Sequence, residues 1–426
     1  MGSLEYFQLP AIKRSIFVSL STFQFLRFVR WGVFYSFMYI YLYTLMGTIT
    51  LTALLGTFNM IASTLGQNLL WGRIADKYRV RARLVMIGEA LAGVFYIGVF
   101  SLHRHLLNTG SSFTAGLSII FGLSTLEFFW SMSDVGWAAL LTDVTTPQIR
   151  GSTVGLLNFV GSIGRLIGIS FAGMLYGNGV GFSEGTIFYV VSTMLFTGSL
   201  VMFTASRIER PISAKAELKK ELSKEEDKHG KHLYLWCFTS LAIVVLGATS
   251  INQVFLIFLR LPEGLHASDP DVSLILTMWT IGGMMASVSS GKLADRVGKA
   301  KVLMYGFVMA AIAPLLYGVV PNVVVMALVY GLSGVASWII QTVGFALVGD
   351  SIPSTRRGRL FSVYNAIMSL AWGPAGLLIG GPLADVQTEI VGLIRHTAYI
   401  NTFMASSAIT LAGTILFFIK VKEKHQ

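Results

Sequence analysis

A short loop signature occurs twice in this chain, and each copy ends a long apolar stretch and opens a cluster of lysines and arginines. The two copies read GRIADK at residues 72–77 and GKLADR at residues 291–296. A second pair of signatures follows them, DVTTPQIRG at 143–151 and DSIPSTRRG at 350–358. Paired signatures inside paired apolar halves predict a duplicated bundle of membrane helices, and such bundles usually move solutes by rocking about a central site.

One constant spacing confirms the repeat within the sequence itself. From Asp143 to Asp350 is 207 residues. The same spacing relates further identical pairs: Gly151 and Gly358, Asn158 and Asn365, Ser162 and Ser369, Gly173 and Gly380. Chance rarely preserves so many identities in register, so the two halves are homologous.

Composition supports a membrane protein, because charged residues make up only 12% and hydrophobic residues 54% of the 426 residues, whereas soluble domains carry about 25% charge. Apolar runs of roughly 20 residues recur along the chain, each long enough to cross a bilayer. The predicted spans are 15–42, 50–72, 82–102, 113–141, 152–177, 186–206, 233–258, 272–291, 300–320, 322–349, 359–383 and 396–420. We therefore expect an all-α integral membrane fold of twelve transmembrane helices in two six-helix, pseudo-symmetric bundles. Residues 1–206 and 233–426 form the bundles, and 207–232 form a cytoplasmic linker, either a surface helix or a solvated tether.

The distribution of the basic residues indicates how the chain is oriented in the membrane. The net charge is +11, and about 26 of the 32 lysines and arginines lie in the termini and alternate loops that the positive-inside rule makes cytoplasmic. This placement predicts a multi-pass plasma-membrane protein with both termini cytoplasmic and argues against nucleic-acid binding. The single cysteine, Cys237, excludes an intramolecular disulfide.

On these loop signatures and spans, the whole chain resembles the major facilitator superfamily. That family's loop after the second span reads Gly-x-x-x-Asp-Arg/Lys-x-Gly-Arg/Lys-x-Arg/Lys. The first copy matches at Gly72, Asp76 and Lys77, with Arg79 in place of the second glycine and the basic residue Arg81 between the last two basic positions. The second copy matches at Gly291, Asp295, Arg296, Gly298, Lys299 and Lys301. The resemblance implies a secondary transporter that works by alternating access.

The resemblance also implies a cytoplasmic gate. Asp76 would meet the eleventh span near Arg357, and Asp295 the fifth span near Arg150, which would latch the cytoplasmic side in the outward-open state. A carboxylate at such a place can meet the positive end of a helix and a nearby arginine. Asp143 and Asp350 open the second signature pair and complete the predicted gate. The alternative is charge that only sets topology, which explains the basic residues but not the paired aspartates.

The fifth span resembles the glycine motif of proton-driven drug antiporters in this superfamily. Four of its six positions match, with Ile169 where a proline belongs: Gly155, Gly164, Gly168, Ile169, Ala172 and Gly173. Glycine-rich packing alone can give the same pattern. Those antiporters usually carry an arginine in the fourth span, where this chain carries acids, so the match is a partial indication of export.

Five ionisable residues lie near the middle of predicted spans in the first half. Arg27 and Arg30 share a face of span 1, as Glu127 and Asp134 do of span 4, and Arg165 follows Asn158 on span 5. Each ionised group at a helix centre costs roughly 2.5–3.5 kcal/mol on insertion scales. These groups are therefore expected to converge on one another or on water, or to hold helices together. Three arginines against two carboxylates favour an anionic group, whereas a desolvated Glu127 or Asp134 can carry a proton.

The second half is neutral at the corresponding positions. Its candidate cavity residues are polar amides and tryptophans: Gln253, Trp279, Gln341, Asn365 and Trp372. We expect a cavity charged on one wall and aromatic on the other, suited to an amphiphilic solute. Glu89, further toward the cytoplasm on span 3, is expected to pair with loop arginines.

These features favour proton-coupled export or flipping of amphiphilic, drug-like or lipid-like compounds. The alternative is a carrier of organic anions, carboxylated or phosphorylated, gripped by the arginines, and a remote one is a transport-inactive receptor. The sequence contains no P-loop, metal-ligand spacing, nucleophile elbow or dinucleotide fingerprint, so we expect no enzyme activity, cofactor or metal. The expected partners are a small-molecule substrate, protons and the lipid bilayer, with the protein a monomer.

Overall fold

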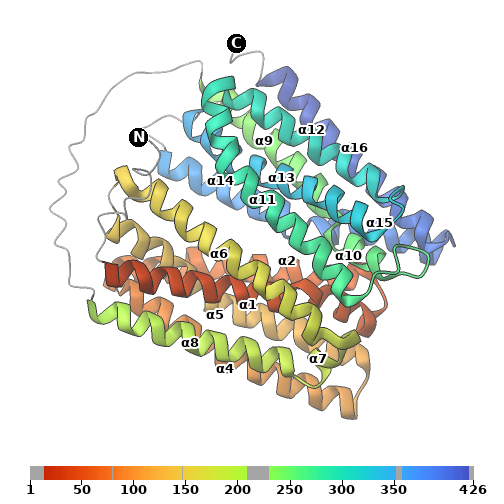
Figure 1. Ribbon diagram of the computed structural model, residues 1–426, viewed down its shortest axis with the longest axis horizontal. Coiled ribbons are helices and arrows are strands. Elements are labelled where there is room, and N and C mark those ends of the chain that lie inside the picture. The colour runs from red at the N-terminus through yellow and green to blue at the C-terminus, as the bar shows by residue number, and fades with distance from the viewer. Residues whose placement is uncertain (1–13, 79, 146, 209–229, 352–356, 422–426) are drawn as a thin grey trace. The chain divides into compact units, whose positions relative to one another are not determined.

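The computed structural model describes residues 14–78, 80–145, 147–208, 230–351 and 357–421, and these are almost entirely helical, with no strand among them (Figure 1). The longer helices of the first half are α1 (Arg14–Met46), α2 (Ile49–Leu65), α4 (Arg81–Thr109), α5 (Ser112–Val144), α6 (Pro147–Tyr176) and α8 (Thr186–Ile208). Those of the second half are α9 (Gly230–Ser250), α10 (Asn252–Arg260), α11 (Asp269–Val297), α12 (Lys299–Tyr317), α13 (Val323–Ser351), α14 (Arg357–Trp372) and α16 (Arg395–Lys420).

Short segments complete the helices. The π-helix η2 (Gly66–Trp71) and α3 (Gly72–Tyr78) continue α2, while η3 (Gly177–Gly179) and α7 (Val180–Ser183) follow α6. The π-helices η5 (Gly376–Gly380) and η6 (Val386–Ile390) flank α15 (Gly381–Asp385). Such π-segments are rare and concentrate at functional sites.

The helices account for the predicted spans. In the described part of the chain ten helices are long and apolar enough to cross a membrane, and the bent pair Asp269–Ser287 and Ser289–Val297 gives an eleventh. The 33 residues of α1 extend about 50 Å, more than the ~30 Å hydrocarbon core, although arginines and tyrosines lower its hydropathy. Ten or eleven of the twelve predicted spans are thus confirmed, and α1, which is long enough to cross a bilayer, occupies the position of the remaining one.

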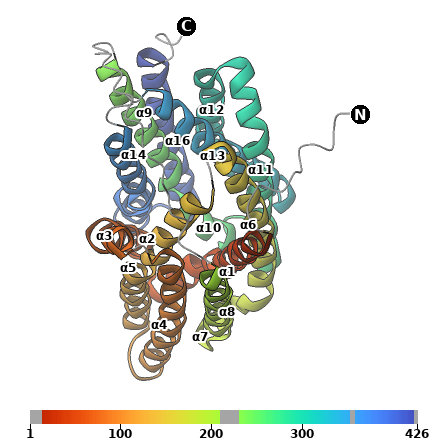
Figure 2. The same cartoon turned by 90° about the vertical axis from the view of Figure 1, so that its left-hand side faces the viewer.

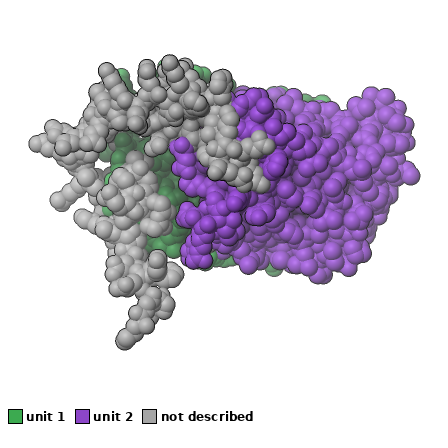
Figure 3. All heavy atoms as spheres, turned by 90° about the horizontal axis from the view of Figure 1, so that it is seen from above, with its two compact units in different colours: residues 1–36, 62–218 green, residues 37–61, 219–426 purple. Residues whose placement is uncertain are grey.

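The chain folds into two compact units, coloured separately in Figure 3. Unit 1 contains residues 1–36 and 62–218, and unit 2 contains residues 37–61 and 219–426. The last third of α1 and most of α2 are thus grouped with the second half of the chain. The predicted linker falls mostly on residues 209–229, outside the described residues, so the domain boundary there stays a prediction.

In unit 1, α4 packs along both α5 and α8 (Figures 1 and 2). A cluster of edge-to-face rings joins α1, α4 and α8: the centroid of Phe34 lies 4.8 Å from that of Tyr96 and 5.4 Å from that of Phe188. All three side chains are buried. This apolar packing fixes α1 against α4 about one turn beyond Arg30, and so positions the arginines of α1.

In unit 2, α13 packs along α11 and α12, and α16 packs along α9 and α12. The span that contains α9 and α10 is interrupted at Ile251, which leaves the helical region (φ −98°, ψ 4°). Gly298 separates α11 from α12 with a φ of 101°. Glycine adopts that conformation without strain, which explains the glycine in the second copy of the loop signature.

Residues 37–61 join unit 2 through a seam along α14, η5 and α15. The Asp385 carboxylate accepts hydrogen bonds from the first backbone amides of α2, Ile49 N at 3.1 Å and Thr50 N at 2.7 Å. It thereby caps a helix whose amino-terminal N–H groups have no partner within the helix. Gly381 packs against the backbone of Thr50, and Gly373 against Met60.

Candidate functional site

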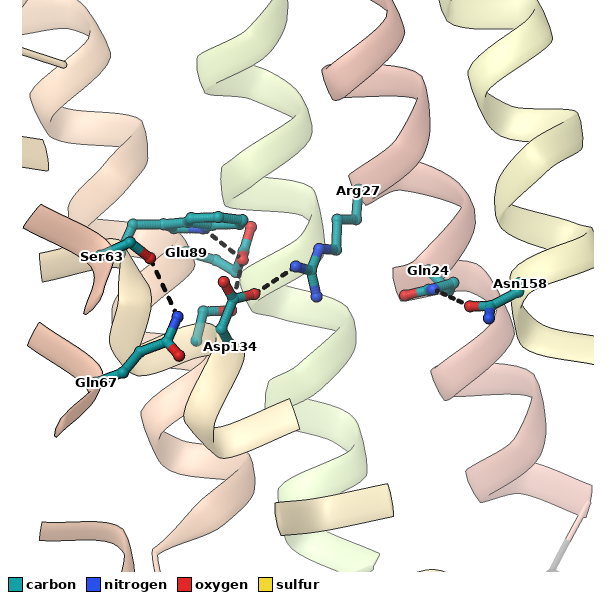
Figure 4. Close-up of polar contacts among 9 residues, drawn as sticks. Gln24, Arg27, Ser63, Gln67, Glu89, Asp134 and Asn158 are labelled. Carbon is teal, nitrogen blue, oxygen red and sulfur yellow. Dashed lines mark hydrogen bonds and ion pairs between the residues drawn. The ribbon is translucent and has the colours of Figure 1, made fainter. Parts of the chain in front are cut away.

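Arg27 and Asp134 form an ion pair between α1 and α5 within unit 1 (Figure 4). Their side chains are 20% and 25% exposed. Both residues were predicted from the sequence as mid-membrane charges, and the structure brings them together. Both members of the pair are thus partly exposed, whereas Arg30 and Glu89 beside them are buried.

The indole of Trp130 organises the charges next to this pair. The guanidinium carbon of Arg30 lies 4.4 Å from the ring centroid, and that of Arg27 lies 5.2 Å from it. The indole Nε1 donates a hydrogen bond of 2.8 Å to Glu89. One aromatic side chain therefore contacts two cations through its face and an anion through its edge, as its charge distribution favours.

Glu89 belongs to this cluster, which corrects the expectation that it pairs with loop arginines. Its carboxylate also accepts a 2.7 Å hydrogen bond from Ser133 Oγ, and the residue is only 2% exposed. Arg30, which is 5% exposed, is its principal electrostatic partner. The packing of α4 against α5 and α1 brings Glu89 here, and no spacing in the sequence shows that packing.

Glu127 lies on the α2 side of the cluster. Its carboxyl hydrogen-bonds with Ser63, whose Oγ accepts a 3.1 Å bond from Gln67 Nε2. Asp134, Arg30 and Arg27 all act on it electrostatically. The two acids of α5 that the sequence predicts therefore interact electrostatically with the arginines of α1.

The ionic cluster, as we call Arg27, Arg30, Glu89, Glu127 and Asp134, contains three carboxyl groups and two guanidinium groups. With all five ionised, its formal charge is −1. The sequence suggests a surplus of positive charge; the balance of this cluster differs because Glu89 belongs to it and Arg165, which lies over Trp31, is not counted in it. A buried cluster with a surplus carboxylate favours uptake of a proton or another cation.

The remaining predicted residues of the first half lie on α6, which packs closely on α1. The guanidinium carbon of Arg165 lies 4.1 Å from the ring centroid of Trp31. Asn158 accepts a 3.2 Å hydrogen bond from Gln24 on α1 (Figure 4). A Cβ atom on Gly164 or Gly168 would meet the α1 backbone, so these glycines of the fifth-span motif permit the contact between the two helices.

The predicted residues of the second half belong to unit 2 and carry no charge. Gln253 follows the helix break at Ile251, is buried, and hydrogen-bonds with Tyr39. Trp279 is half-buried on α11. The other three side chains are exposed: Gln341, Asn365 and Trp372.

The gate signatures form equivalent ion pairs in each half. Arg81, the first residue of α4, pairs with Asp143 near the end of α5. Lys299, the first residue of α12, pairs with Asp350 near the end of α13 at 2.5 Å. The pairs join the same ends of equivalent helices and so support the internal repeat.

Several other gate residues are only partly described. Gly72 opens α3, the side chain of Lys77 lies over Tyr78, Gly291 is half-buried, and Asp295 and Arg296 are exposed. The side chains of Asp76, Arg150 and Arg357 lie outside the described residues, so their contacts stay predictions.

A separate cavity of about 360 Å³ lies in unit 2, where α1, α15, η6 and α16 meet. The sequence did not indicate it. Its polar lining residues are Tyr43, Glu263, Asp385, Thr388, Glu389, Arg395 and Tyr399. Among the residues that the structure describes, no three His, Cys, Asp or Glu side chains gather to hold a metal ion.

Relatives with matching sequences include an MFS-type transporter and a drug-resistance protein. The chain is 28% identical over 177 residues to an uncharacterized MFS-type transporter of Mycobacterium tuberculosis, an alignment that covers 42% of this chain and 25% of that protein. It is 23% identical over 159 residues to the quinolone resistance protein NorA of Staphylococcus aureus, covering 37% of this chain and 39% of NorA. The alignments thus span well under half the length of these relatives.

Solved structures share the fold over nearly the whole chain. A mutant form of the nucleoside transporter NupG superposes with a TM-score of 0.73 at 14% identity, covering 94% of this chain and 100% of that one. A D-xylose–proton symporter gives 0.70 at 14% identity, covering 93% and 96%. A bacterial homologue of the lysosomal transporter Spinster gives 0.68 at 12% identity, covering 95% and 96%. At these identities the likeness shows the fold.

The family model described as Major Facilitator Superfamily matches residues 20–262 and again 237–426. These two matches cover almost all of the chain. Together with the helical fold and the internal repeat, they identify the chain as a member of the major facilitator superfamily with a multi-pass membrane fold.

Proposed function

We propose that this protein is a proton-coupled exporter or flippase-like carrier of amphiphilic compounds, drug-like or lipid-like, in the plasma membrane, with both termini cytoplasmic. The observation that carries the proposal is the surplus carboxyl group of the ionic cluster. Arg27 and Arg30 neutralise two of its three acids, so one carboxyl group can hold a proton that substrate binding displaces.

Glu127 and Asp134 are the carboxyl groups to which we assign proton exchange. Asp134 is the more exposed member of its ion pair, and Glu127 reaches a chain of polar side chains through Ser63 and Gln67. Because each lies within the field of the other, protonation of one stabilises ionisation of its neighbour. The two groups share the exchangeable proton as a coupled pair.

The charge balance favours this function over transport of organic anions. A substrate carboxylate or phosphate would enter a cluster that already contains more acids than arginines, and like charges raise the cost of burial. The similarity to NorA, whose name concerns quinolone resistance, also supports export of drug-like compounds. Arg165, which lies over Trp31, is the arginine through which an anionic head group would act in the rival scheme.

Proteoliposomes containing a pH-sensitive dye test the proposal directly. Addition of a cationic amphiphile such as tetraphenylphosphonium to vesicles with an imposed pH gradient is expected to drive proton flux, whereas a dicarboxylate is not. Glu127→Gln and Asp134→Asn are expected to abolish the dependence on the gradient, while Glu184→Gln, an acid outside the cluster, retains it. Proton flux driven by the dicarboxylate alone, or coupling unchanged in both cluster variants, would refute the proposal.

The gate is part of the same proposal. We assign Asp76 and Asp295 to control of the cytoplasmic side, alongside the pairs Arg81–Asp143 and Lys299–Asp350 that join neighbouring helix ends in each half. Asp76→Lys is expected to favour the inward-facing state. Accessibility of cysteines introduced on the cytoplasmic side measures the change, and a pattern identical to that of the parent protein contradicts the assignment.

A further inference from the structure

Glu89 is the most completely enclosed charged group of the ionic cluster. Two hydrogen bonds hold its carboxylate, one from Trp130 Nε1 at 2.8 Å and one from Ser133 Oγ at 2.7 Å. The void beside it is lined by Phe23, Leu26 and Met194 together with the arginines of α1. Gly198 of α8 closes the same side. Apolar packing and satisfied hydrogen bonds leave this carboxylate no contact with bulk water.

The other two acids differ from Glu89 in the two properties that proton exchange requires. Asp134 is 25% exposed, and its ion-pair partner Arg27 is 20% exposed. Glu127 is only half-buried and contacts the polar pair Ser63 and Gln67. In the described part of the chain, polar or exposed side chains thus adjoin these two carboxyl groups, whereas Glu89 is enclosed by Trp130, Ser133, the arginines of α1 and apolar side chains.

The geometry points to Glu89 as a positioning residue: a permanent counter-charge, held by Trp130 and Ser133 against Arg30, that leaves Glu127 and Asp134 to share Arg27 and one exchangeable proton. This inference rests on the proposed proton coupling and deepens it, because it names which carboxyl group stays ionised. Trp130 keeps the role of Glu89 separate from that of the other two acids, because its ring faces both guanidinium groups while its indole nitrogen donates a hydrogen bond to the Glu89 carboxylate.

The electrostatic consequence depends on every group that faces Glu127. Those that the structure describes are Arg27 and Arg30 of α1, Ser63 of α2, Tyr96 of α4 and Asp134 of α5. Glu89 and Tyr35 act on Arg30 and reach Glu127 through it. Neutralising Glu89 removes a negative charge and releases Arg30 to act on Glu127. Both changes favour the ionised form of Glu127, so a higher proton concentration is needed to protonate it.

The first experiment measures the pH dependence of amphiphile transport by the full-length protein in proteoliposomes. Glu89→Gln is expected to require about tenfold more protons for half-maximal transport, moving the profile toward acid by about one pH unit. Ser133→Ala and Trp130→Phe each remove one donor to Glu89 but retain its charge, so each is expected to shift the profile much less. A purely structural role for Glu89 would lower activity without moving the profile.

Infrared difference spectroscopy on the purified protein provides a second measurement that needs no transport. Acidification of the parent protein is expected to produce a protonated-carboxyl band that Glu127→Gln or Asp134→Asn removes and Ser133→Ala leaves unchanged. A band that shifts in Ser133→Ala and survives both other substitutions would assign the proton to Glu89 and overturn the inference. A parent protein without pH-dependent transport would instead refute the proposed function, while the band would still test which acid is ionised.

Discussion

The same pair of helices meets in both halves of the chain, but the contact includes ionisable and polar side chains in unit 1 and is made of glycines in unit 2. In unit 1, Ser63 of α2 hydrogen-bonds with Glu127 of α5. Ser63 lies nine residues before Gly72, and Gly282 of α11 lies nine residues before Gly291 in the second copy of the signature. The 207-residue spacing relates Glu127 to Gly334 of α13.

In unit 2 these positions bring backbone against backbone. A Cβ atom on Gly282 would meet the carbonyl of Gly331, and one on Gly334 would meet the backbone of Trp279. Small residues permit such close packing of membrane helices without polar groups. The comparison indicates that the duplicated halves diverged in role: unit 2 keeps a tightly packed helix pair where unit 1 places ionisable groups.

The largest expected effect is a loss of stability when glutamate, the unit 1 residue, is introduced at the corresponding position of unit 2. Gly334→Glu introduces both a steric clash with Trp279 and an unpaired buried carboxylate, which we expect to cost at least about 4 kcal/mol of folding free energy. Folded protein recovered after size-exclusion chromatography measures the loss. The matched substitution Glu127→Gly in unit 1 is expected to fold and to lose pH coupling. A stable Gly334→Glu protein would break the comparison.

Removal of Arg30 tests whether the unit 1 cluster is held by charge compensation. Arg30→Ala leaves Glu89 without its main counter-charge, and the loss of one partner from a buried pair typically costs about 3–5 kcal/mol. Glu89→Gln in the same molecule is expected to restore part of the thermal stability, because the uncompensated charge is then absent. Equal melting temperatures for the single and double variants would show that Arg30 acts through packing alone.

Arg27 tests whether substrate is handled at the exposed edge of the cluster. Arg27→Ala disrupts the ion pair with Asp134 and is expected to weaken amphiphile affinity about tenfold, in the range of one charged hydrogen bond. Arg104→Ala, an exposed arginine on α4, serves as the control and should bind as the parent protein does. Isothermal titration or thermal-shift curves measure both, and equal affinities would contradict a substrate role for the unit 1 charges.

Asp385 gives the smallest expected effect and sharpens the contrast, because it is an acid of unit 2 whose carboxylate caps a helix. Asp385→Ala removes two hydrogen bonds to the first amides of α2, and loss of such a cap typically costs about 1 kcal/mol. The melting temperature should fall slightly while the pH profile of transport stays the same. Glu389→Ala, in the same cavity, is the control. A shifted pH profile would mean that unit 2 also takes part in proton coupling.

The fold could be predicted from the sequence because the patterns that indicate it are local and occur twice. Runs of apolar residues mark the spans, and one constant spacing reveals the duplication. The interruptions of the helices could not be predicted from the sequence. The break at Ile251 and the π-segment at 376–380 depend on how neighbouring helices pack against those turns, and composition does not encode that packing.

The candidate site was predicted in part. Residues three or seven apart share a helix face, so the pairs Arg27 with Arg30 and Glu127 with Asp134 could be found by counting. Glu89 and Trp130 could not, because their importance arises from the packing of α4 on α5 and α1. A tryptophan four residues before Asp134 looks like ordinary apolar material until the arginines are seen over its ring.

The grouping of residues 37–61 with unit 2 has a consequence for anyone who divides this protein into fragments. A cut between α8 and α9 leaves the beginning of α2 on one polypeptide and its capping carboxylate, Asp385, on the other. The N-terminal piece then contains all the described residues of unit 1, but unit 2 is divided between the two pieces, so we expect unit 2 to fold completely only when both are produced together in one membrane. The sequence repeat and the compact units of this protein are therefore offset from each other by residues 37–61, which are nearly three turns of α1, the turn that follows it and most of α2.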